Sequence, residues 1–117
     1  MILSAQQLEK LRPPLLERAD ALLANYLQRR FPMIGSVLDA DGVRRFVRSH
    51  RYAALKYGID REDNVAVYLD IVAMYGPDFP TQEWARDVLS SRLHGPDKVA
   101  LLRHRLSAHG VTFGADG

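Results

Sequence analysis

Apolar residues along the chain recur mostly three or four positions apart, which is the spacing of one face of an α-helix. Over residues 14–31 the apolar positions at this spacing are Leu15, Leu16, Ala19, Leu22, Leu23, Tyr26 and Leu27. The whole pattern predicts helices at residues 5–11, 14–31, 41–57, 61–75, 82–93 and 97–109. No run of five or more residues alternates apolar and polar side chains, as a half-buried strand would. The sequence therefore predicts an all-α protein, a compact bundle of five to six helices.

One predicted helix differs from the others because it is apolar on nearly every side. Within residues 61–75 the apolar positions are Val65, Val67, Tyr68, Leu69, Ile71, Val72 and Met74. A helix that is apolar around most of its circumference is normally surrounded by other elements. We therefore expect residues 61–75 to form the central helix of the bundle.

Three similar tripeptides divide the second half of the chain, and they are Gly58-Ile59-Asp60, Gly76-Pro77-Asp78 and Gly95-Pro96-Asp97. Glycine adopts the left-handed conformation that ends many helices, and an aspartate can accept hydrogen bonds from the first N–H groups of the next helix. We expect each tripeptide to end one helix and begin another. Asp41 and Thr81 are predicted to cap two further helices in the same way.

The two consecutive prolines, Pro13 and Pro14, predict a break or kink near the start of the chain. The residue before a proline is pushed away from helical geometry, whereas a proline itself fits the first turn of a helix. We expect residues 1–110 to form one domain and residues 111–117 to be a flexible tail. The sequence leaves open whether residues 1–12 pack on the bundle or exchange with another copy in a homo-oligomer.

Charge is balanced overall but unevenly distributed. The 117 residues contain 16 Lys and Arg against 14 Asp and Glu, a net charge of +2. Residues 39–59 hold five basic and two acidic residues, whereas residues 60–75 hold one basic and four acidic ones. Helices joined by a short turn tend to be antiparallel neighbours. We therefore expect these two segments to neutralise each other in part.

Arg44, Arg48 and Arg51 are spaced to form one stripe along a helix. The stripe is consistent with a solvated face, with a surface for an acidic protein partner, or with a nucleic-acid contact. Aromatic residues that could stack on bases are missing from the stripe. The small net charge also argues against a nucleic-acid binder.

The sequence contains no recognisable catalytic or metal-binding motif. There is no Cys, which excludes disulfides and thiolate chemistry, and no two of the four His are three or four residues apart. The carboxylates of Asp60, Glu62 and Asp63 fit the first turn of a helix, where acids complement the helix dipole. We expect no catalytic residue, metal or cofactor, and hence a protein that is not an enzyme. With no membrane span and no targeting signal in the sequence, we expect a cytoplasmic protein without a membrane partner.

The most distinctive stretch runs from Met74 through the Gly76–Pro80 turn to the Trp84-Ala85 pair. Phe79 and Trp84 are candidates to pack across this turn as an aromatic clamp. They are either ordinary core residues or an anchor for a partner, since Trp and Tyr are enriched at interface hot spots. The residues predicted to bind a protein are Asp78, Phe79, Trp84, Arg44, Arg48 and Arg51.

This stretch, together with Tyr57-Gly58-Ile59, resembles a group of small all-helical proteins encoded beside VgrG and PAAR spike genes in bacterial type VI secretion clusters. The resemblance runs from about Tyr26 to Leu106, and residues 80–83 are less acidic here than in many such proteins. It implies a cytoplasmic chaperone, co-chaperone or adaptor that helps load an effector onto the spike, and it brings no catalytic residues. The alternatives are an immunity protein that neutralises a co-encoded toxin and a small nucleic-acid-binding helical domain.

Overall fold

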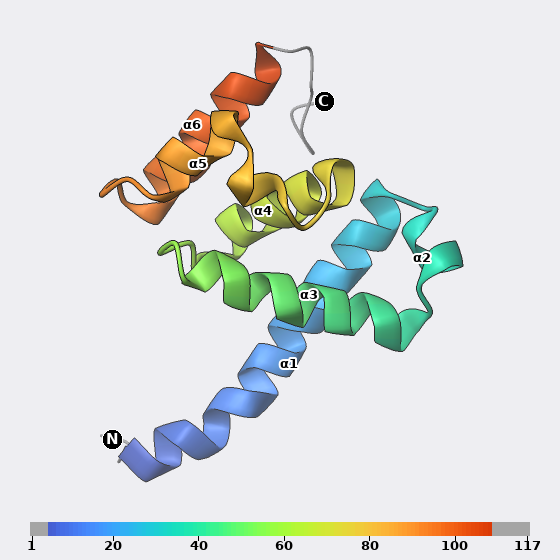
Figure 1. Cartoon of the computed structure of the whole chain (residues 1–117). Coiled ribbons are helices and arrows are strands. Elements are labelled where there is room, and N and C mark those ends of the chain that lie inside the picture. The colour runs from blue at the N-terminus through green and yellow to red at the C-terminus, as the bar shows by residue number, and fades with distance from the viewer. Residues whose placement is uncertain (1–4, 109–117) are drawn as a thin grey trace.

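The computed structural model describes the backbone of residues 5–108 and the side chains of residues 18–108. Its elements are α1 (Ala5–Arg30), α2 (Ile34–Val37), α3 (Ala40–Leu55), α4 (Glu62–Tyr75), the 3₁₀-helix η1 (Phe79–Thr81), α5 (Glu83–Leu89) and α6 (Gly95–Ser107). No strand occurs within this part of the chain, and the predicted all-α bundle is confirmed (Figure 1). The short helix α2 lies between the helices predicted at residues 14–31 and 41–57. The predicted tail, residues 111–117, lies outside the described residues.

The helix α4 is the centre of the fold, as its apolar circumference predicts. It contacts α1, α3, α6 and η1. Its middle part is the most buried, with Val65, Tyr68, Leu69, Asp70, Ile71 and Val72 removed from solvent. Figure 1 shows α1 and α3 crossing each other on one side of α4, while α5 and α6 lie side by side on the other. The bundle is thus two helix pairs that share one central helix.

The first helix does not break at its prolines. α1 runs without interruption from Ala5 to Arg30, so the separate helix predicted at residues 5–11 is wrong. A proline ring fixes φ near the helical value, and a helix that passes through it loses one hydrogen-bond donor and crowds the preceding turn without having to end. Figure 1 shows the N-terminal part of α1 projecting beyond α3, away from the other helices.

Two of the three glycine turns end helices as predicted. Gly58 follows α3 with a φ of 78°, and Gly76 follows α4 with a φ of 92°. The third glycine, Gly95, instead begins α6. A Cβ atom at this position would overlap the carbonyl oxygen of Gly58, so glycine is needed here because two chain segments touch.

The predicted helix caps are wrong in detail. Asp39, two residues before the expected Asp41, caps α3, and its carboxylate accepts a 2.6 Å hydrogen bond from the N–H of Gly42. Asp60 and Thr81 cap nothing, because α4 and α5 begin after Arg61 and Gln82 without a side-chain cap. The hydroxyl of Thr81 donates instead to the carbonyl of Asp78 within η1. The apolar spacing did not predict this 3₁₀ turn, which places Thr81 before α5 begins.

Lys98 fastens the two helix pairs together one turn after Gly95. Its side chain is buried, with the residue 6% exposed, and its Nζ donates to the carbonyls of Tyr57 (3.0 Å) and Leu89 (2.7 Å). These carbonyls lie just after α3 and at the end of α5, where exposed carbonyl groups favour a cation. The start of α6 therefore holds the ends of α3 and α5 in place.

Replacing Gly95 with Ala is expected to lower the free energy of unfolding by about 1–3 kcal/mol, because the added methyl group forces the Gly58 turn away from α6. Urea unfolding followed by circular dichroism measures this loss. Gly35→Ala is the matched control, since a Cβ atom there meets nothing within 4 Å. Equal stability of the two variants would contradict the close contact at Gly95.

Candidate protein-binding surfaces

Three aromatic rings lie together where α4 ends and α5 begins, and we call Tyr75, Phe79 and Trp84 the aromatic corner. The Trp84 ring stacks on Phe79 with centroids 5.8 Å apart and planes 16° from parallel. Tyr75 meets Trp84 edge-on, with centroids 5.5 Å apart. The predicted clamp of Phe79 and Trp84 across the turn is therefore confirmed. Such contacts fix ring orientation as well as burying apolar area.

The members of the aromatic corner differ in what they present to solvent. Phe79 is 0% exposed and also packs edge-on against Tyr68, so it is a core residue that no partner can touch. Trp84 is half-buried, and Tyr75 is 44% exposed. Asp78 is exposed beside them. The structure thus leaves Tyr75, Asp78 and one part of Trp84 as the accessible residues of this region.

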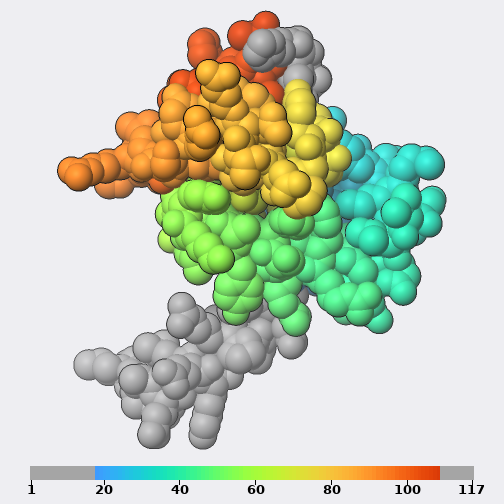
Figure 2. Space-filling model, in the orientation of Figure 1, coloured from blue at the N-terminus to red at the C-terminus, as the bar shows by residue number. Residues whose placement is uncertain are grey.

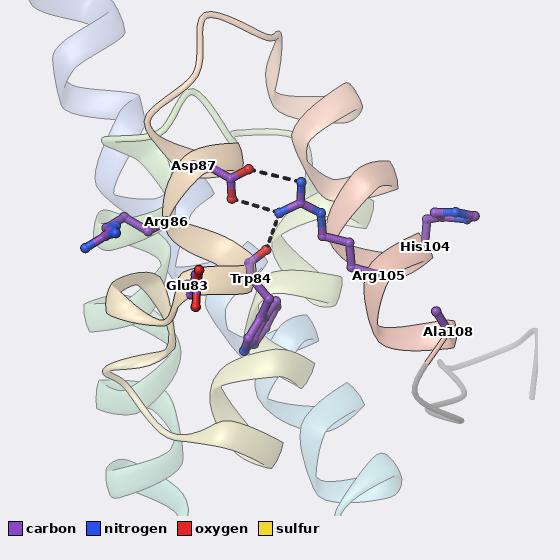
Figure 3. A pocket seen from close by; sticks show the side chains of 7 residues that line it. All are labelled: Glu83, Trp84, Arg86, Asp87, His104, Arg105 and Ala108. Atoms are coloured by element: carbon purple, nitrogen blue, oxygen red, sulfur yellow. Dashed lines mark hydrogen bonds and ion pairs between the residues drawn. The ribbon is translucent and has the colours of Figure 1, made fainter.

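A pocket of about 800 Å³ opens beside Trp84 between α5 and α6 (Figure 3). Its lining residues are Glu83, Trp84, Arg86, Asp87, His104, Arg105 and Ala108. Arg105 fixes the wall: its Nη1 donates to the Trp84 carbonyl (2.6 Å) and to Asp87 Oδ1 (2.7 Å), and its Nη2 donates to Asp87 Oδ2 (3.0 Å). A bidentate pair of this kind sets the orientation of both side chains. The indole of Trp84 therefore lies beside a rigid, charged wall.

The charges of this wall are locked in their ionised forms. The hydrogen bonds from Arg105 lower the pKa of the Asp87 carboxyl below its ordinary value, and the same bonds raise the pKa of Arg105. Neither group exchanges a proton near neutral pH. The pocket therefore offers a ligand an aromatic surface beside fixed polar groups.

The predicted arginine stripe lies on α3 but pairs with an unexpected helix. Arg51 Nε donates to Asp20 Oδ1 (2.7 Å) and Arg51 Nη2 donates to Asp20 Oδ2 (3.2 Å). Arg48 Nε lies 3.5 Å from the same carboxylate. Asp20 belongs to α1 and is 2% exposed. The stripe is thus anchored to α1.

The predicted partial neutralisation of the basic segment by the acidic one is therefore wrong as far as the described ion pairs go. The described ion pairs of α3 join it to α1 and not to α4. α3 and α4 do pack together, but Glu62 and Asp63 are exposed at the first turn of α4. The remaining acid of α4, Asp70, is buried and faces α1, where Tyr26 donates a 2.6 Å hydrogen bond to it. Adjacent helices place only some of their side chains in contact, and sequence order does not say which.

Beside this anchor lies a polar groove of about 420 Å³, which we call the arginine groove. It is lined by Asp20, Ala21, Asp41, Arg44, Arg45 and Arg48. Two of the three predicted arginines, Arg44 and Arg48, line the groove, whereas Arg51 is largely occupied by Asp20. The stripe predicted from spacing is therefore divided between one structural residue and two that border a surface groove.

An apolar groove of about 500 Å³, which the sequence did not predict, lies around α2. Its lining residues are Phe31, Met33, Ile34, Val37, Leu38, Phe46, Val72 and Ala73. Met33 and Val37 are strongly exposed. Figure 2 shows that α2 and the segment from Tyr75 to Trp84 occupy different parts of the surface. The signal that could have found this groove is the set of apolar residues between the predicted helices.

The burial of three charged residues, Asp20, Asp70 and Lys98, was not predicted from the sequence. Asp70 Oδ2 accepts from Tyr26 and lies 3.9 Å from Arg30 Nε. Burial raises the pKa of Asp70 above its ordinary value, and burial, followed by the hydrogen bond to Asp70, raises the pKa of Tyr26. The signal was present: an aspartate in the middle of a helix that is apolar all round has no solvated face to occupy.

Comparison of the chain with protein-family models, with curated proteins and with solved structures finds no match. In the described part of the chain, none of the helices combines the length and the apolar character required to cross a bilayer. Among the same residues, no three His, Asp or Glu side chains gather in a way that could hold a metal ion. The function has to be argued from the surfaces themselves.

Asp20→Asn is expected to lower the free energy of unfolding by about 1.5–3 kcal/mol, because the variant weakens two charge-assisted hydrogen bonds that join α1 to α3. Chemical denaturation of both proteins measures the difference. Asp41→Asn removes an exposed carboxylate from the same groove and should cost less than about 1 kcal/mol. A loss at Asp20 no larger than at Asp41 would show that the anchor does not stabilise the fold.

Asp70 is expected to make the protein less stable as pH rises. Its pKa in the folded chain lies above the ordinary 3.8, so folding favours the protonated acid, and this contribution is lost as pH rises from about 4 through the raised value. The free energy of unfolding of the native chain, minus that of Asp70→Asn, should therefore fall over this range. Urea titrations at several pH values test the trend.

Proposed function

We propose that the protein is a non-enzymatic binding module that helps load an effector onto the spike of a type VI secretion machine, as a chaperone, co-chaperone or adaptor. The secretion context comes from the resemblance of the Met74–Ala85 stretch and of Tyr57-Gly58-Ile59 to proteins of such clusters. The binding role is supported by one observation above the others. Trp84 lines a pocket whose wall is fixed by Arg105 and Asp87, and the exposed ring of Tyr75 packs against Trp84.

The composition of this surface suits a protein partner. Tyr, Trp and Arg are the residues that most often dominate the energy of protein interfaces. Here the Trp84 ring is stacked on Phe79 and meets Tyr75 edge-on, so its side chain loses little freedom on binding. We therefore assign Tyr75 and Trp84 as the residues that anchor the partner, with Asp78 at the edge of the same surface. Phe79 acts by supporting Trp84 instead of touching the partner.

Tyr75→Ala is expected to weaken partner capture by about tenfold or more, since it removes an exposed aromatic anchor. The test is a pull-down from a secreting bacterium with the native chain as bait, read by mass spectrometry for effector, adaptor and spike proteins. Tyr52→Ala is the matched control, because Tyr52 is a 56% exposed tyrosine on α3, outside the aromatic corner. Recovery of no secretion component with the native chain would overturn the proposal.

A second measurement separates loading from toxin neutralisation. A chaperone or adaptor raises the abundance or secretion of its effector when the two are co-expressed. An immunity protein instead restores the growth of cells that produce the toxin. Growth protection without any effect on effector abundance would count against the proposed function and favour the immunity role.

A further inference from the structure

The arginine groove contains more positive charge than the fold uses. Arg44 and Arg45 are exposed, and neither makes a hydrogen bond or ion pair with the side chains of residues 18–108. The Arg48 side chain is 54% exposed, and its single contact with Asp20 is long, at 3.5 Å. Surface pairs of that length contribute little to stability. These three guanidinium groups are therefore available to a ligand.

The carboxylates in the groove do not cancel this charge. Asp20 is already bound by two hydrogen bonds from Arg51, which does not line the groove. Among the described residues that line the groove, three arginines then remain against the carboxylate of Asp41, an excess of two positive charges. A concave surface with a charge excess of one sign attracts ligands of the opposite sign.

The groove is also prearranged. Arg44 and Arg48 are one turn apart on α3, and Arg45 is three residues from Arg48, so all three project from one rigid helix. Asp20 and Arg51 fix α1 against this helix, and Asp20 also lines the groove. Its volume, about 420 Å³, is in the range of ordinary ligand sites. The arginine side chains lose freedom on binding, but the backbone that carries them does not move.

We propose that the arginine groove binds an acidic segment of the protein partner, with side-chain carboxylates paired to Arg44, Arg45 and Arg48. This inference rests on the proposed function, because it assumes that the chain binds a protein. Guanidinium groups match carboxylates in a bidentate geometry. Nucleic acid fits less well, because none of the described residues that line the groove is aromatic and could stack on a base, and three cations would neutralise only a few phosphates.

The test is direct titration of the purified chain with a short fluorescent poly-glutamate peptide at low salt, read by anisotropy. The double variant Arg44→Gln, Arg45→Gln is expected to bind roughly fivefold to thirtyfold more weakly, because two surface ion pairs are lost. The variant Arg29→Gln, Arg92→Gln removes two exposed charges outside the groove and should leave the affinity unchanged. Both pairs of residues are exposed, so both variants should fold as the native chain does.

Three results would overturn the inference. They are no binding of the peptide by the native chain, equal weakening in the two double variants, and tighter binding of a single-stranded oligonucleotide of the same charge. The outcome is separable from that of the pull-down. Capture of secretion proteins without peptide binding rejects only the groove, whereas peptide binding through the groove without such capture rejects only the secretion role.

Discussion

The contact between the start of α6 and the turn after α3 is the constraint on which the rest of the bundle depends. Gly95 lets the two backbones touch, and Lys98 brings an ammonium group to the carbonyls of Tyr57 and Leu89. A buried cation is tolerated only when its hydrogen bonds are made, so both helix ends have to be in place. α5 is then held at its end by Lys98 and at its beginning by η1. The pose of Trp84 follows from these two attachments.

Buried carboxylates hold α1 in place, as Lys98 holds α5 and α6. Asp20 takes hydrogen bonds from Arg51 on α3, and Asp70 on α4 takes one from Tyr26. Each acid is removed from water, and each is placed between helices distant in sequence, so the pairs specify which faces meet. The same arrangement has a consequence at the surface. Because Arg51 satisfies Asp20, Arg44 and Arg45 have no hydrogen-bond or ion-pair partner among the side chains of residues 18–108, and both border the groove.

Local patterns predicted most helices and two of the turns, although the separate helix at residues 5–11 and the caps at Asp41 and Thr81 were wrong. Apolar spacing gave the helices and identified α4 as central, and glycine chemistry placed the turns at Gly58 and Gly76. Other predictions failed where a contact between segments distant in sequence determines the role of a residue. Glycine is required at position 95 because the carbonyl of Gly58 touches it, and Arg51 pairs with Asp20 although the acids of α4 are nearer in sequence. The aromatic clamp of Phe79 and Trp84 succeeded because both residues belong to one short turn.

By itself, the sequence determined an all-helical chain, its central helix and the aromatic turn, because these depend on spacing over a few residues. Only the tertiary structure decided that Phe79 is core while Tyr75 faces solvent, since burial depends on what the rest of the chain places above each ring. Likewise, only the tertiary structure decided that Arg51 pairs with Asp20 while the other arginines of the stripe line the groove, because this requires Asp20 to lie against α3. Helix periodicity is a short-range property, whereas surface chemistry is set by contacts between segments far apart in sequence.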